Sequence, residues 1–93
     1  MRTIDRHGSF KRDYKREAKG PHRKTLDAVL VPVLRALVTD QALAPRYRDH
    51  DLTGDWNGHR ECHLKPDLLL IYRKVDDDAL ILVRLGSHSE LFG

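Results

Sequence analysis

The sequence predicts an α+β protein in which N-terminal helices pack on one face of a small, mainly antiparallel sheet. Two patterns carry this prediction: apolar residues recur at helical spacing in the first half, and three apolar runs separated by short polar turns fill the second half. Helices followed by consecutive strands are typical of layered α+β proteins, because the strands pair with their neighbours and the helices cover one face. With 93 residues, we expect one domain, 1–93, built around a single core.

The first elements of the chain are expected to be a short strand and a helix. Thr3–Arg6 has an extended pattern and should lie at a sheet edge. Ser9 is a candidate N-cap for a helix over Phe10–Lys19, which Gly20 and Pro21 would end.

A second helix, starting near Lys24, has the strongest helical periodicity in the chain. Its apolar positions are Leu26, Val29, Leu30, Val33, Leu34 and Leu37. This stripe predicts that the helix covers the sheet. Pro32 lies inside it and should kink the helix or split it into two segments, because proline lacks an N–H and crowds the preceding turn.

The second half of the chain is expected to form three strands and a final helical turn. The strands are predicted at about His59–Leu64, Asp67–Lys74 and Ala79–Leu85, and the short turns between them indicate antiparallel neighbours. The middle strand is apolar on both faces and should be the most buried. Ser87 and Glu90 have the spacing of a capping box, which predicts a short helix at the C-terminus.

The composition excludes several classes of protein. The chain is 40% hydrophobic and 33% charged, which is typical of a folded globular protein. No apolar run approaches the roughly 20 residues that a membrane span needs, and the N-terminus has no apolar stretch typical of an export signal. The single cysteine, Cys62, has no partner for an internal disulfide. We therefore expect a cytoplasmic protein that does not contact membranes.

Positive charge is concentrated between residues 11 and 24, where seven Lys and Arg face two acidic residues. Such a segment attracts phosphate groups, mostly without sequence preference. Lys11, Lys15 and Arg16 are therefore candidate contacts to RNA. A solvated helix face with no ligand explains the same pattern equally well.

A metal site at His59, Cys62 and His63 is the first alternative to test. In a strand, His59 and His63 point to one face while Cys62 points to the other, so the three cannot grip one ion without a bulge. Structural zinc sites also normally have four ligands with looped spacings. We therefore expect no metal and no cofactor.

Acid–base chemistry fits the polar residues better. His50, His63, Asp67 and His88 are expected near one end of the sheet, with Arg84 beside them. Two histidines can act as base and acid in one reaction cycle, and a guanidinium suits the oxygens of a phosphate. On a basic domain without a phosphate-binding glycine loop, this set points to metal-free RNA cleavage through the ribose 2′-OH. The plainer interpretation is that the histidines are ordinary surface residues and that Asp67 is a turn residue.

Two segments, RDHDLTGDWNGHRECHLKPDLLLIY and LILVRLGSHSELFG, resemble the signature of YafQ-type toxins, a branch of the RelE superfamily in bacterial type II toxin–antitoxin systems. The histidine before the loop, the loop tryptophan, CH-x-x-PD, the apolar strand ending in tyrosine and GSH-x-x-LF occur in the family order. One departure is Leu68, which stands where some relatives have tryptophan.

The resemblance implies a RelE-like fold and an endoribonuclease that cuts mRNA on the ribosome, contacts ribosomal RNA and is neutralised by a cognate antitoxin. That antitoxin would be a ribbon-helix-helix protein similar to DinJ. The resemblance implies catalytic roles for His50, His63, Asp67 and His88, and substrate contacts for Arg84 and Phe92. Two alternatives stay open: a toxin of the same fold that binds a protein such as DNA gyrase, and a plain nucleic-acid-binding module.

Overall fold

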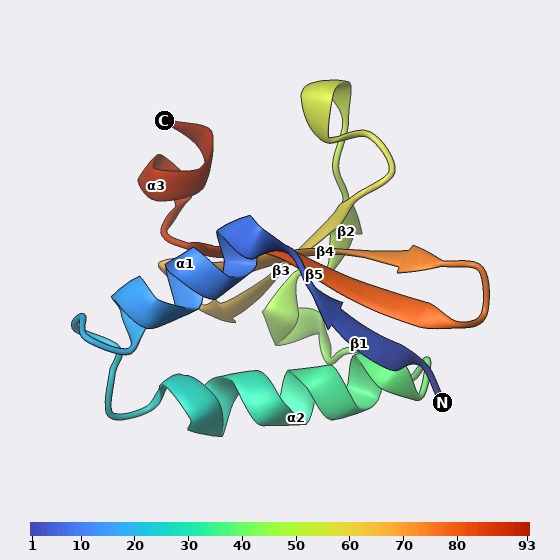
Figure 1. Ribbon diagram of the computed structural model, residues 1–93, viewed down its shortest axis with the longest axis horizontal. Coiled ribbons are helices and arrows are strands. Elements are labelled where there is room, and N and C mark those ends of the chain that lie inside the picture. Colours follow the sequence, from blue (N-terminus) through green and yellow to red (C-terminus); the bar gives the residue numbers. More distant parts are fainter.

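The computed structural model describes residues 1–93 and consists of a five-stranded sheet with three α-helices (Figure 1). The sheet and its flanking helices confirm the predicted α+β architecture. In chain order the elements are β1 (Thr3–Arg6), α1 (Gly8–Glu17), α2 (Leu26–Val38), the short 3-10 helix η1 (Pro45–Tyr47), β2 (His50–Asp51), a second 3-10 helix η2 (Gly54–Trp56), β3 (Arg60–Lys65), β4 (Leu68–Val75), β5 (Ala79–Gly86) and α3 (His88–Phe92).

The strand order in the sheet is β1-β5-β4-β3-β2. The three long strands β3, β4 and β5 are antiparallel neighbours, as the short turns between them predicted, and β1 adds to β5 in parallel at the edge. β4 occupies the centre, and its first five residues, Leu68–Tyr72, are all buried. Alternation along β4 sends Leu70 toward the helices and Ile71 toward the opposite face, which explains why the run is apolar throughout.

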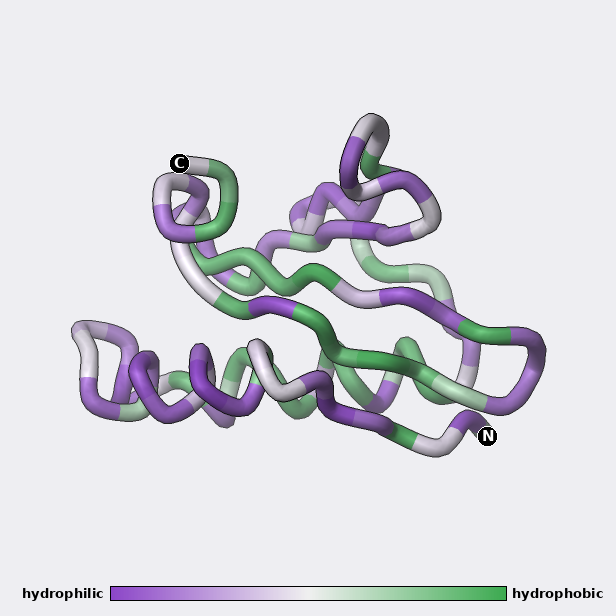
Figure 2. Tube along the Cα trace, turned by 45° about the horizontal axis from the view of Figure 1, so that its top comes forward, coloured by the Kyte–Doolittle hydropathy of each residue, from purple (hydrophilic) through white to green (hydrophobic).

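The main core lies between α2 and one face of the sheet. Leu30, Val33 and Leu37 of α2 are at most 4% exposed and pack with the side chains that the strands send to this face, among them Cys62 and Tyr72. In Figure 2 the apolar stretches are concentrated in the central strands and α2, while α1 is mainly hydrophilic. The sheet face toward α2 therefore supplies most of the buried apolar surface.

α2 runs without interruption from Leu26 to Val38, so Pro32 does not split the helix, and a kink at Pro32 stays a prediction. Pro32 and Ala28, whose carbonyl the proline ring would crowd, are both exposed. The Ala28 carbonyl receives no helical hydrogen bond from Pro32, and at this exposed position it can bond to water instead. The buried apolar residues on the other side of α2 keep both halves of the helix packed on the sheet.

α1 begins two residues earlier than predicted, and its N-cap is His7 rather than Ser9. The His7 side chain accepts from the Ser9 N–H. The Ser9 hydroxyl instead donates to the Val83 carbonyl at 2.7 Å. The prediction failed because this bond joins residues far apart in the sequence, so no local pattern shows it.

α1 closes the part of the β5 edge that β1 leaves open. β1 pairs only with Ala79–Leu82. Beyond that point Asp13 accepts from the Leu85 N–H at 3.0 Å, and Arg16 donates to the Leu85 carbonyl at 2.8 Å. These bonds satisfy backbone groups that would otherwise remain unpaired at the sheet edge.

The opposite face of the sheet is partly covered by α3. Its Leu91 packs with Leu69, Ile71 and Val83 in a second, smaller core. The predicted capping box at the start of α3 is confirmed, because the Ser87 side chain accepts from the Glu90 N–H and the Glu90 side chain accepts from the Ser87 N–H. Figure 1 shows α3 and the loop that carries η2 on the side of the sheet away from α2. No helix is long and apolar enough to cross a membrane.

Candidate active site

Three titratable side chains meet on β2 and β3. Pairing places His50 directly opposite Glu61, and His63 follows two residues later on the same face of β3. Glu61 Oε1 lies 3.3 Å from His63 Nε2 and 3.8 Å from His50 Nε2. The side chains are 6% exposed for Glu61, 21% for His63 and 50% for His50. A buried carboxylate is thus flanked by two imidazoles that reach solvent to different degrees.

The tautomer of His50 is determined by its backbone contact. His50 Nδ1 lies 2.6 Å from the Arg48 carbonyl oxygen, which can only accept, so Nδ1 carries the hydrogen. In the neutral ring, Nε2 is then the basic nitrogen. Nε2 is also the atom that faces Glu61. The arrangement allows His50 to take up a proton at Nε2, with the nearby carboxylate compensating the new positive charge.

Glu61 is the member of this group that sequence reasoning missed. Its place opposite His50 depends on β2 pairing with β3, and β2 has only two residues, too few to give a periodic pattern. The available signal is the alternation of His59, Glu61 and His63, which share one strand face.

A second, aromatic group lies beside α3. The rings of His88 and Phe92 are 5.0 Å apart, and Phe92 contacts Trp56 of η2 edge-on at 6.1 Å. His59 in turn packs edge-on against Trp56 at 5.4 Å. These contacts tie the C-terminus to the loop before β3, so segments far apart in sequence meet over the sheet face that carries His63.

α3 is held in place by an ion pair with α1. Arg16 Nε lies 3.0 Å from Glu90 Oε2. The Ser87 N–H holds the pKa of Glu90 below its usual value, with smaller contributions from the Ser87 hydroxyl and the charge of Arg16. A Cβ at Gly86 would lie 2.7 Å from an Arg16 nitrogen, so any other residue here would force the end of the Arg16 side chain to shift.

Arg84 is fixed by a buried carboxylate. Its Nε donates to Asp13 Oδ2 at 2.6 Å and its Nη2 to Oδ1 at 3.3 Å. Burial by itself raises the pKa of Asp13, but the hydrogen bonds from Arg84 and the Leu85 N–H, together with the charges of Arg84 and Arg16, outweigh burial and keep the pKa low. Asp13 therefore fixes the orientation of the Arg84 guanidinium and neutralises part of its positive charge.

Asp67 lies apart from the histidine group. It sits in the turn between β3 and β4, its side chain is 72% exposed, and its ion-pair partner is His22 Nε2 at 3.4 Å. The turn carries the side chain toward the loop between α1 and α2. Asp67 thus forms no ion pair with the histidines beside which it was expected, and its catalytic role stays a prediction.

The predicted basic contacts differ in their surroundings. Lys11 and Lys15 are exposed on α1. Arg16 is bound to Asp13, Glu17 and Glu90. The Arg16 side chain is still 41% exposed despite these bonds, so RNA can reach it. Its role as an RNA contact stays a prediction.

Cys62 packs in the main core, on the sheet face opposite His63, as strand alternation predicted. Burial raises the pKa of its thiol to about 12, with additional contributions from the negative charges of Asp49 and Glu61. No group of three or more His, Cys, Asp or Glu side chains is arranged to hold a metal ion.

Fold and site together define a small basic α+β protein of the RelE-like type, with histidines and a buried carboxylate on the sheet face opposite its main helix. Residues 2–93 match the family model described as the bacterial toxin of type II toxin–antitoxin system, YafQ. The chain therefore belongs to the YafQ toxin family.

Relatives in other bacteria match the chain over its full length. It is 34% identical over 92 residues to the mRNA interferase toxin YafQ of Escherichia coli K12, covering 97% of this chain and 99% of that protein. A copper-bound mutant toxin from Helicobacter pylori has 42% identity and a TM-score of 0.90, covering 99% and 100% of the two chains. YafQ in the E. coli DinJ–YafQ complex has 35% identity and a TM-score of 0.84, with both chains fully covered.

Proposed function

We propose that this chain is an mRNA interferase, an endoribonuclease toxin that cleaves mRNA on the ribosome. Membership of the YafQ family supports the proposal, together with the activity named for the E. coli relative. The observation in this chain that carries it is the Glu61 carboxylate between two imidazoles. Such a group suits a reaction that removes one proton and delivers another.

The proposed chemistry is a transesterification without metal or cofactor. One histidine accepts the proton of the ribose 2′-OH, whose oxygen attacks the neighbouring phosphorus atom. A second protonated histidine gives its proton to the departing 5′-oxygen, so the products are a 2′,3′-cyclic phosphate and a 5′-hydroxyl. His50, His63 and His88 are the candidates for these steps, and Glu61 compensates the charge on whichever neighbouring imidazole is protonated.

Other residues act on the substrate in this proposal. Arg84 stabilises the extra negative charge on the phosphate in the transition state. Phe92, supported by Trp56, stacks against an mRNA base. Asp67 assists proton transfer after a movement of its exposed side chain. Lys11, Lys15 and Arg16 contact phosphates of mRNA or ribosomal RNA.

The proposed partner is a cognate antitoxin similar to DinJ, of the ribbon-helix-helix type. The complex of E. coli YafQ with DinJ supports this choice, because the two toxins align over their whole length. The site of action is the cytoplasm, where the ribosomes are.

Mapping of mRNA ends in cells that express the chain tests this function. Wild type should generate new 5′ ends within translated regions. His63→Ala should generate none, while His7→Asn, a histidine change at the α1 cap that retains a capping side chain, should behave as wild type. Uncut transcripts together with inhibited DNA supercoiling would contradict the nuclease and favour a toxin that binds gyrase.

A further inference from the structure

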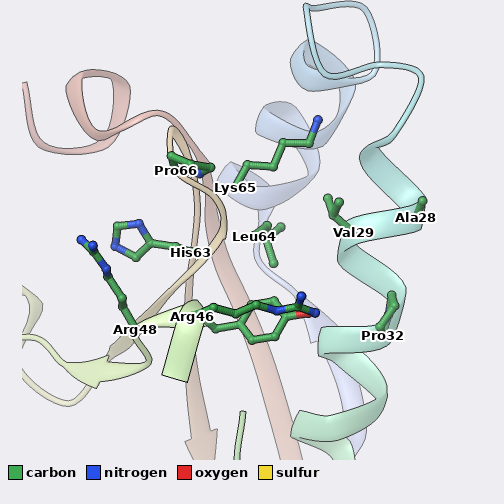
Figure 3. A pocket seen from close by; sticks show the side chains of 10 residues that line it. Ala28, Val29, Pro32, Arg46, Arg48, His63, Leu64, Lys65 and Pro66 are labelled. Carbon is green, nitrogen blue, oxygen red and sulfur yellow. The ribbon is translucent and has the colours of Figure 1, made fainter. Parts of the chain in front are cut away.

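A groove of about 580 Å³ lies between α2, η1 and β3, next to the histidine group (Figure 3). Val29 and Pro32 of α2 form one wall, and Leu64 contributes to the opposite side. His63 also lines the groove, so the groove adjoins the site that contains Glu61. Its volume is within the range of about 300–1,000 Å³ that is usual for small-ligand sites.

The polar lining of the groove is basic. Arg46, Arg48 and Lys65 contribute side chains, and no Asp or Glu is among the lining residues. Arg46 and Arg48 form no ion pair, whereas Arg84 is bound to Asp13. Lys65 forms no ion pair, and its hydrogen-bond partners are the neutral Thr25 hydroxyl and the His22 ring. The groove therefore favours a ligand that carries negative charge.

Arg46 and Tyr47 line the groove together, with the Arg46 guanidinium over the Tyr47 ring. The Arg46 guanidinium carbon lies 4.9 Å from the centre of the Tyr47 ring, and its Nη2 donates to the Tyr47 hydroxyl at 3.0 Å. Figure 3 shows Arg46 between β3 and α2. Arg46 is exposed, so the side of its guanidinium that faces away from Tyr47 can stack on a nucleobase.

We propose that this groove binds one nucleotide of the single-stranded RNA substrate, adjacent to the phosphate that is cleaved. The base stacks on Arg46 and contacts the apolar wall at Val29, and its phosphate binds Arg48, which lies beside His63 (Figure 3). This assignment rests on the nuclease function proposed above. The exposed guanidinium of Arg46 and the shared His63 favour RNA over an acidic protein segment, which would use the positive charge but would have no base to stack on Arg46.

Binding can be measured apart from cleavage. The ¹⁵N-labelled chain is titrated with a short 2′-O-methyl RNA oligonucleotide of mixed sequence, which has no 2′-OH to attack. The amide resonances of Arg48, Leu64 and Lys65 should shift in a saturable way. If they stay unmoved while Lys11 and Lys15 on α1 respond, the proposal is overturned. It is also overturned if the groove amides respond only to the cognate antitoxin.

Two variants test the charge and the space of the groove. Arg48→Gln should weaken RNA binding about tenfold and lower the slope of log affinity against log salt by about one. Ala28→Trp keeps the charge but fills the groove from an exposed position on α2, and it should weaken binding by at least as much. Arg35→Gln removes an equally exposed charge from α2 outside the groove and should have no effect.

Cleavage kinetics separate failure of this inference from failure of the proposed function. If wild type cleaves ribosome-bound mRNA, Arg48→Gln should raise KM about tenfold and leave kcat nearly unchanged. Normal cleavage with an unchanged KM would overturn the groove assignment alone. If wild type does not cleave any mRNA, the nuclease proposal fails, while the titration still reports whether RNA enters the groove.

Discussion

Glu61 is the residue on which the proposed chemistry depends most and which local sequence patterns reveal least. It is buried on β3, and its carboxylate lies within 4 Å of both His50 and His63. A protonated imidazole next to this carboxylate is compensated without the movement of any other group. Glu61 therefore acts as a positioning residue for the two histidines that exchange protons with the substrate.

Glu61→Gln keeps the shape of this side chain and removes its charge. We expect kcat for mRNA cleavage to fall about ten- to a hundredfold, because the imidazoles lose their orientation and their compensating charge. KM should stay close to the wild-type value, since Glu61 does not contact the substrate. Asp5→Asn, on exposed β1, is the matched control. A variant with wild-type kcat would show that Glu61 has no part in catalysis.

Cys62 is a packing residue of the core, although cysteine side chains elsewhere can be reactive. Its thiol is completely buried and its pKa is raised to about 12, so almost no thiolate is present at neutral pH. Iodoacetamide should label Cys62 in urea but not in the native protein. Cys62→Ala should lower the free energy of unfolding by about 1–2 kcal/mol and leave cleavage unchanged. Rapid labelling of the native chain would contradict this assignment.

At the scale of elements, α1 is joined to β5 by polar bonds as well as by apolar packing. Asp13 connects the two through Arg84 and the Leu85 N–H. Because the carboxylate is almost completely buried, its removal leaves two donors without their partner.

Asp13→Asn should lower the free energy of unfolding by about 2–3 kcal/mol at pH 7, measured by urea denaturation. The pKa of Asp13 is lowered in the folded state. Its contribution is therefore complete above the ordinary aspartate pKa of about 3.9, and it is lost as the pH falls through the folded value. The difference between wild type and variant should shrink below about pH 4. Asp5→Asn should change stability little, and a constant difference down to pH 2 would contradict this account.

The placement of α3 depends on close contact with Arg16. Gly86→Ala would put a methyl group against the end of this flexible side chain. We expect a loss of only about 1 kcal/mol in stability, because Arg16 can move, but a several-fold fall in cleavage as His88 and Phe92 lose their fixed positions. Gly8→Ala, whose new methyl would meet nothing closer than 3.7 Å, is the control. Cleavage unaffected by Gly86→Ala would show that α3 need not be held in place.

At the scale of the whole molecule, the sheet separates the main core from the histidine group. Its α2 face buries the main core, and the opposite face carries Glu61, His63 and the aromatic contacts around α3. The central strand β4 contributes to both faces, so a change there affects the core on one side or the site on the other.

Local patterns predicted the elements well and the long-range contacts poorly. The three long strands were located to within one residue at each end, because alternation and short turns are visible locally. The pairing of Thr3 with Ala79 and the bond of Asp67 to His22 join distant segments, which no periodicity encodes. The same holds for the placement of Glu61 opposite His50, which depends on the pairing of the two-residue strand β2 with β3.

The most direct test of the account is cleavage of ribosome-bound mRNA by purified protein under single-turnover conditions. Wild type should cut the message and leave a 2′,3′-cyclic phosphate. His63→Ala should be slower by at least about a hundredfold while the protein stays folded under the assay conditions. Equal rates for wild type and His63→Ala, or fragments that end in a 3′-hydroxyl, would contradict acid–base cleavage at the histidine group.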